Sequence, residues 1–269
     1  MLFAQITDLH IRSPGLTVAG RVQTADFLAR AVAKLNRLDP QPDFLLITGD
    51  LVDRGTADEY AYLAECLTPL AMPVRLAVGN HDGRDGFRAT FGVNDYWDPA
   101  EPFVQYALDA GPVRLLVLDT LDMGKPSGAL CDQRLDWLAA RLAEDRKVPT
   151  VIALHHPPVS VGMNMMDSIG LLHGAARLHG LIAAAPNVER LLAGHLHRSV
   201  TVRFAGTVLD VMPGEAHQCH LDLAEGVPQQ LILEPPMIQL HLWVEGTGVV
   251  SHKVLVDDFE GPYPFESPD

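Results

Sequence analysis

F-L-L-I-T-G-D, at residues 44–50, is a short apolar run that ends in a glycine and a carboxylate. Its apolar character predicts a strand buried on both faces over residues 44–48, followed by a loop that begins at Gly49–Asp50. Four other polar blocks also follow apolar runs, namely D-L-H at 8–10, G-N-H-D at 79–82, H-H at 155–156 and G-H-L-H at 194–197. Side chains at successive strand ends can converge in space although they lie far apart in sequence. We therefore expect the five blocks to form one site.

The first two-thirds of the chain alternates strand-like and helix-like segments. Besides 44–48, strands are expected over residues 2–7, 74–78, 103–108, 113–118, 150–154 and 188–192. Apolar positions at helical spacing predict helices over residues 22–38, 57–70, 131–144 and 171–184. After residue 197, the strand-like segments 200–204, 207–212, 238–244 and 249–256 follow one another. This order predicts one α/β catalytic domain over residues 1–257, with two packed sheets inside and helices outside.

Two C-terminal segments depart from this alternation. Residues 214–240 are irregular because Pro228, Pro235 and Pro236 interrupt them, yet they carry several apolar residues. We expect this segment to form a small β-rich cap or a dimer contact, and the protein to be a homo-oligomer. Residues 258–269 are acidic and rich in proline, which predicts a mobile tail.

Composition and charge restrict the class of partner. The 269 residues can bury a large core, and the formal net charge is −14 at pH 7. That charge argues against a nucleic-acid polymer as a partner, because such a polymer needs a basic face. No apolar run is long enough to span a membrane, and the first residues lack the features of a signal peptide. The scattered Cys66, Cys131 and Cys219 predict reduced thiols. We expect a cytoplasmic protein that does not bind a membrane.

The residue types of the five blocks are those of a metal site. Mixed carboxylate, amide and imidazole ligands suit manganese, iron, cobalt or zinc better than calcium. Two metal ions about 3.5–4 Å apart need a ligand that bridges them. A carboxylate has two oxygens for this purpose, and Asp50 in the central block is the natural bridge.

In this order, the blocks D-x-H, G-D, G-N-H-D, H-H and G-H-x-H resemble those of the calcineurin-like metallophosphoesterases. The chain is most similar to the branch of class III cyclic nucleotide phosphodiesterases and glycerophosphodiesterases, from Asp8 to His197 and more weakly over P-G-E-A-H at 213–217. The resemblance implies a four-layer αββα sandwich and two divalent or trivalent transition metal ions. The ligands that it implies are Asp8, His10, Asp50 and His197 for one ion, and Asp50, Asn80, His156 and His195 for the other.

The resemblance also implies two catalytic residues. His81 matches a histidine that contacts the phosphate or assists the leaving group, and Asp53 matches a carboxylate that orients this histidine. Asn80 and His81 are expected to bind the substrate. His217 joins them because it lies in a loop after the last ligand strand, where a side chain can face the substrate.

Two other residues in the blocks have less obvious roles. His155 directly precedes the expected ligand His156, so on a strand its side chain should point to the opposite face. We therefore expect His155 to be a buried support rather than a ligand. Asp82 has two interpretations, since it suits a helix N-cap as well as a functional position.

The function implied by the resemblance is hydrolysis of small phosphodiesters, such as cyclic AMP or glycerophosphodiesters. Bound metal ions lower the pKa of water, and a hydroxide that bridges them attacks the phosphorus. The positive charge of the metals would attract the substrate without a basic patch. Alternatives are a phosphomonoesterase, a phosphonate-ester hydrolase, or a binding module that uses the fold without catalysis. Discrimination between substrates is expected in the loops over residues 12–20, 159–170 and 214–236.

Overall fold

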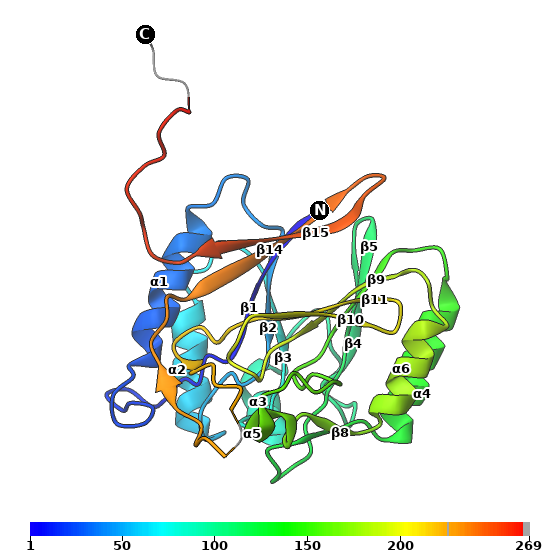
Figure 1. Cartoon of the computed structure of the whole chain (residues 1–269), viewed down its shortest axis with the longest axis horizontal. Helices are drawn as coiled ribbons and strands as arrows, with labels where there is room; N and C mark the ends of the chain where they lie inside the picture. Colours follow the sequence, from blue (N-terminus) through cyan, green and yellow to red (C-terminus); the bar gives the residue numbers. More distant parts are fainter. Residues whose placement is uncertain (225, 266–269) are drawn as a thin grey trace.

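Two β-sheets lie face to face in the centre of the molecule, and helices cover their outer faces (Figure 1). They belong to a computed structural model that describes residues 1–224 and 226–265. The first sheet has the strand order β15-β14-β1-β2-β3. Its strands are β1 (Leu2–Ile6), β2 (Phe44–Thr48), β3 (Val74–Ala77), β14 (Met237–Val244) and β15 (Gly248–Leu255). The first three run parallel, whereas β14 pairs antiparallel with β1 and with β15.

The second sheet has the order β10-β11-β9-β7-β5-β4. Its strands are β4 (Tyr106–Ala110), β5 (Val113–Val117), β7 (Thr150–Ala153), β9 (Val188–Ala193), β10 (Val200–Phe204) and β11 (Thr207–Val211). The four inner strands are parallel, and antiparallel strands close both edges. Strands buried on both faces explain the continuous apolar runs in the sequence.

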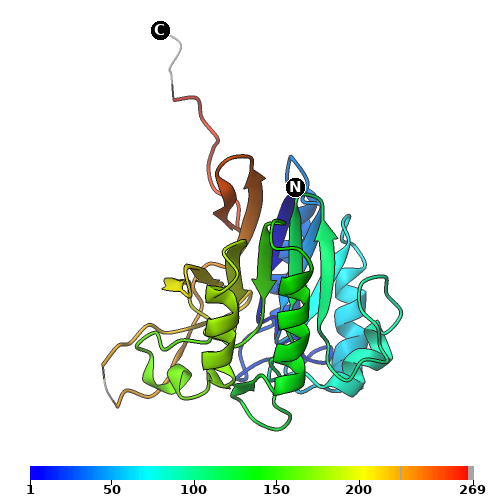
Figure 2. The same ribbon diagram turned by 90° about the vertical axis from the view of Figure 1, so that its right-hand side faces the viewer.

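Helices on both outer sides complete four layers (Figure 1), and Figure 2 looks onto the helices of one side. The helices α1 (Thr24–Asn36), α2 (Ala57–Leu67) and α3 (Arg84–Phe91) share a core with the first sheet, whereas α4 (Asp132–Glu144) and α6 (Ala175–Ala183) share one with the second. Leu28, Val32 and Leu35 recur at helical spacing and are buried, which fixes the inner face of α1. The predicted αββα sandwich is confirmed. In the described part of the chain, no helix has the length and apolar character needed to cross a membrane.

One predicted helix, over residues 171–184, is partly wrong. Its first residues form the short strand β8 (Leu171–His173), which pairs with β6 (Gly128–Ala129). Gly174 then turns the chain with a φ of 83°, and α6 begins after it. A Cβ at Gly174 would lie 2.4 Å from the carbonyl oxygen of Leu130, so this break requires glycine. The helices α3 and α5 (Asn164–Asp167) were not predicted.

The C-terminal part of the chain contributes strands to the first sheet and also contacts helix α1. Within residues 214–240, β12 (Gln218–Cys219) and β13 (Leu231–Ile232) form a small ribbon, while the last residues already belong to β14. Asp258, at the start of the expected tail, pairs with Lys34 of α1 and with Arg37, the residue that follows this helix. The roles of the segment as a cap or dimer contact, and the mobility of the tail, stay predictions; residues 266–269 lie outside the described residues.

Candidate metal centre

The five polar blocks meet at one edge of the two sheets. They follow β1, β2 and β3 in the first sheet and β7 and β9 in the second, and parallel strands end at the same edge. The Nε2 atoms of His10 and His197 lie 3.1 Å apart, although 187 positions separate the two residues. His155 Nε2 is 3.3 Å from Asp50 Oδ2, which connects the second sheet with the first. The fold thus brings together blocks that are scattered along the chain.

The backbone at these strand ends is unusual. Five non-glycine residues of the blocks have a positive φ, between 46° and 71°, and they are Asp8, His10, Asp50, His195 and His197. The left-handed region costs energy for residues with a side chain, and such strain concentrates at functional sites. Here it occurs in the loops after β1, β2 and β9. All five side chains are buried.

Asp50 lies at the centre of the cluster. Its Oδ1 accepts a hydrogen bond from the backbone N–H of His81 at 2.9 Å, and its Oδ2 faces His155 and, at 3.6 Å, His10. Burial alone would raise the pKa of Asp50. The imidazoles of His155, His81 and His10 outweigh burial and hold this pKa well below its ordinary value. Asp50 therefore carries a negative charge between imidazoles on two sides.

Asp8 occupies the adjacent position and bonds to the last block. Its carboxylate accepts from the backbone N–H of His195 at 2.9 Å and lies 3.3 Å from His197 Nε2. Asp8, His10 and Asp50 each offer a ligand atom within 4.8 Å of the other two. Two carboxylates and an imidazole at this spacing can hold a cation.

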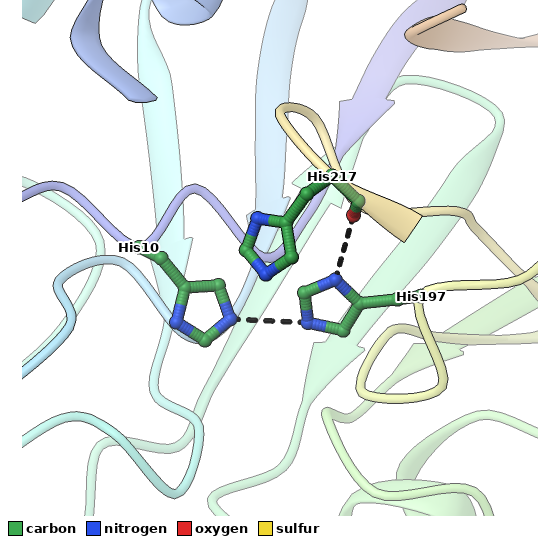
Figure 3. Close-up of side chains that lie close together, drawn as sticks. All are labelled: His10, His197 and His217. Carbon is green, nitrogen blue, oxygen red and sulfur yellow. Dashed lines mark hydrogen bonds between the residues drawn. The ribbon is translucent and has the colours of Figure 1, made fainter. Parts of the chain in front are cut away.

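The rings of His10, His197 and His217 lie close together in the site (Figure 3). His197 donates from Nδ1 to the backbone carbonyl of His217 at 2.8 Å, which directs its Nε2 toward His10. The His217 ring is tilted against both, with ring centroids 4.6 Å from His197 and 5.2 Å from His10. Burial and the two neighbouring histidines lower the pKa of His217 to about 2, so it is neutral near pH 7. Its expected contact with substrate stays a prediction.

The expectation that His155 points away from the site is wrong. His155 donates from Nδ1 to the carbonyl of Thr48 at 2.8 Å, and its Nε2 faces Asp50 with no hydrogen-bond partner among the described residues. The physical reason is that β7 ends at Ala153, so both histidines lie in a bend beyond the strand, where alternation does not apply. His156 is also buried, but its Nδ1 lies 2.8 Å from Thr120 Oγ1 and its Nε2 3.3 Å from the Pro126 carbonyl.

His81 stands at the mouth of the cluster, and its side chain is 40% exposed. Its ring meets that of His10 edge to face, with centroids 4.5 Å apart. Asp53 holds it, but through the backbone carbonyl, which is 2.8 Å from His81 Nδ1; the Asp53 carboxylate is 3.9 Å away. That carboxylate instead pairs with Arg12 at 2.8 Å and faces His10. Burial alone would raise the pKa of Asp53, but His10 and Arg12 lower this pKa to about 2.

Asp82 has a structural role that the sequence did not reveal. It is not the N-cap of α3, which is Gly83. Its buried carboxylate accepts from the backbone N–H of Gly79 at 2.8 Å and of Leu51 at 3.2 Å, and from the hydroxyl of Tyr60. Burial and the nearby Asp50 raise the pKa of Asp82 to about 7. Asp82 thereby ties the loop after β2 to the loop after β3, and these loops carry Asp50 and Asn80.

The unpartnered atoms of the cluster fit metal ions. Among the buried ligand-type atoms that have no hydrogen-bond partner in the described residues are Asn80 Oδ1, His155 Nε2 and His195 Nε2. Burial alone would lower the pKa of His155, yet Asp50 and Asp8 raise it to about 9, so the cluster favours a positive charge at this point. Oxygen and imidazole donors together suit transition metals. The His and Asp clusters are therefore competent to bind metal ions.

Comparisons with known proteins show which family and fold this chain shares. A family model described as calcineurin-like phosphoesterase matches residues 1–199. A probable glycerophosphodiester phosphodiesterase from Arcobacter nitrofigilis is 34% identical over 98% of this chain and 97% of its own length. A probable cyclic nucleotide phosphodiesterase from Rhodopseudomonas palustris is 36% identical over 94% of this chain and 92% of its own length. The crystal structure of a dimetal phosphatase from Danio rerio has the same fold, with a TM-score of 0.64, 15% identity, and coverage of 95% of this chain and 99% of that one.

Proposed function

The chain belongs to the calcineurin-like phosphoesterase family, and from this premise we propose that it hydrolyses small phosphodiesters at a centre of two transition metal ions. The observation that supports this most strongly is Asp50, a buried carboxylate whose oxygens lie among groups from both sheets. When bound, a pair of metal ions supplies Lewis acidity toward the phosphate and activates a water molecule for in-line attack. Manganese, iron, cobalt and zinc all suit these donors.

We assign Asp8, His10, Asp50 and His197 to one ion, and Asp50, Asn80, His195 and His155 to the other. His155 replaces His156 in this assignment because of its hydrogen bonds. A histidine that ligates a metal usually donates its other ring N–H to a carbonyl or carboxylate, as His155 does to Thr48. Both ring nitrogens of His156 already have partners within the protein.

His81 is the residue that we expect to act directly on the substrate. Its backbone N–H is held by Asp50 and its Nδ1 by the carbonyl of Asp53, so the ring has a fixed orientation. Nε2 is then the ring atom that can contact the phosphate or the leaving oxygen. The exposure of the side chain makes this contact accessible from solvent.

Replacing His81 by alanine should lower kcat about a hundredfold, since a positioned acid, base or hydrogen-bond donor contributes at least this much. Both metal ions should remain, because His81 Nε2 is not among the assigned ligands. Turnover of bis(p-nitrophenyl) phosphate and metal content by elemental analysis test both statements. The exposed His252→Ala on β15 is the control and should leave both unchanged. Loss of a metal ion from the His81 variant would contradict the assigned role.

The names of the relatives lead us to propose glycerophosphodiesters or cyclic nucleotides as the substrate class. The purified protein, stripped of metal and reloaded with Mn²⁺, should hydrolyse a glycerophosphodiester or cyclic AMP at least about tenfold faster than p-nitrophenyl phosphate. A phosphonate monoester in the same panel tests the alternative of a phosphonate-ester hydrolase. Absence of Mn²⁺-dependent diester hydrolysis would overturn the proposal and favour the alternative of a binding module without catalysis. Faster turnover of the monoester would indicate a phosphatase.

A further inference from the structure

A set of buried polar side chains connects the C-terminal hairpin with the metal centre. Gln5 of β1 is completely buried, and its Oε1 accepts from His241 Nε2 of β14 at 3.1 Å. His241 Nδ1 lies 2.9 Å from the hydroxyl of Ser251 in β15. Burial and the neighbouring Arg190 lower the pKa of His241 to about 3, so the ring is neutral and can donate from one nitrogen and accept at the other.

The amide nitrogen of Gln5 reaches two more strands. It donates to Thr48 Oγ1 at the end of β2 at 3.0 Å, and to the backbone carbonyl of Ala193 at the end of β9 at 3.4 Å. The strands β1 and β2 belong to the first sheet, whereas β9 belongs to the second. One side chain therefore connects the two sheets through the core.

The two residues that Gln5 contacts on β2 and β9 lie close to assigned ligands along the chain. Thr48 precedes Asp50 by two residues, and Ala193 precedes His195 by two. The backbone carbonyl of Thr48 also accepts the hydrogen bond that orients His155. The ligands come from both sheets, so the distance between the sheets at this point sets the distance between the ligands.

We propose that Gln5 is a positioning residue for the metal centre: its amide fixes the separation between the Asp50 edge of the first sheet and the His195 edge of the second. This inference rests on the proposed binuclear centre. A buried amide is costly unless its hydrogen bonds are made, and an apolar side chain of equal volume would pack there without that requirement. The amide supplies what the apolar side chain lacks, which is directional bonds to both sheets.

The chain offers a matched control for Gln5. Gln239 of β14 is the cross-strand partner of Gln5 in the same sheet and is 2% exposed. Its Oε1 has no hydrogen-bond partner among the described residues. Gln239→Met and Gln5→Met therefore remove the same amide from similar surroundings, but only the latter removes the described bonds to β2 and β9.

Calorimetric titration of the metal-stripped protein with Mn²⁺, together with the EPR spectrum of the loaded protein, tests the role of Gln5. Gln5→Met should raise the dissociation constant of the more weakly bound Mn²⁺ about tenfold and should change the spin-coupled signal of the metal pair. Gln239→Met should leave both as in the wild type, even where the two variants have a similar Tm. Thr48→Ser, which keeps the hydroxyl, should bind Mn²⁺ normally, whereas Thr48→Val should resemble Gln5→Met.

Three results would overturn the inference: unchanged Mn²⁺ affinity and EPR signal in Gln5→Met, equal weakening in Gln239→Met, or a wild-type protein that binds no Mn²⁺ pair. Wild-type protein that binds two Mn²⁺ ions but hydrolyses no diester would contradict the proposed function alone. The titration would then still decide whether Gln5 positions the metal centre.

Discussion

Asp50→Asn should abolish binding of the metal pair and lower diesterase activity at least about ten-thousandfold, since both the metal-activated water and the charge stabilisation depend on it. The substitution preserves the size of the side chain and an oxygen that can accept from His81, but removes the negative charge between the imidazoles. A neutral amide bridges two cations poorly. Elemental analysis should therefore find one equivalent of metal or less.

Asp85→Asn is the control for Asp50, because Asp85 is a fully exposed carboxylate at the start of α3. It should retain two equivalents of metal and full activity. An Asp50→Asn protein that keeps both metal ions and more than a tenth of the wild-type activity would contradict the bridging role of Asp50.

His155→Gln and His156→Gln should differ sharply, although both histidines are completely buried. His155→Gln removes an imidazole nitrogen that faces Asp50, so it should lose one equivalent of metal and lower kcat about a thousandfold. His156→Gln removes contacts to Thr120 and Pro126 and should lower Tm while keeping both metal ions. Metal content, Tm and turnover of the two variants decide between the two histidines.

The comparison of the two variants also separates metal loss from unfolding, because each removes a buried side chain. Loss of a metal ion from His156→Gln, with both ions kept in His155→Gln, would restore the assignment that the sequence suggested. Equal metal loss in both variants would mean that both histidines contribute to metal binding, and it would contradict the assignment of His155 in place of His156.

The fold was largely predictable because strand and helix signals alternate along the chain. Buried parallel strands give apolar runs such as 44–48, and the observed β2 has those same bounds. The helix predicted over residues 171–184 was partly wrong because periodicity does not reveal the pairing of Leu171–His173 with β6, a strand of only two residues. The small ribbon of β12 and β13 is similarly short and has no signal of its own.

The residue types of the site were predictable, whereas the directions of their side chains were not. Carboxylates and imidazoles at strand ends indicated where ligands converge. The direction of His155 depends on the carbonyl of Thr48, a partner 107 positions away, which no local pattern shows. The same holds for Asp82, which bonds to the loop after β2, and for Gln5, which looks like an ordinary strand residue until the second sheet is in place.

A crystal structure of the protein grown with Mn²⁺, with anomalous diffraction data collected at the manganese edge, tests the central claim most directly. Two anomalous peaks are expected about 3.5–4 Å apart, one on each side of the Asp50 carboxylate. His155 Nε2, rather than His156, should coordinate one of the two metal ions. A single peak, no peak near Asp50, or a peak coordinated by His156 would contradict this claim.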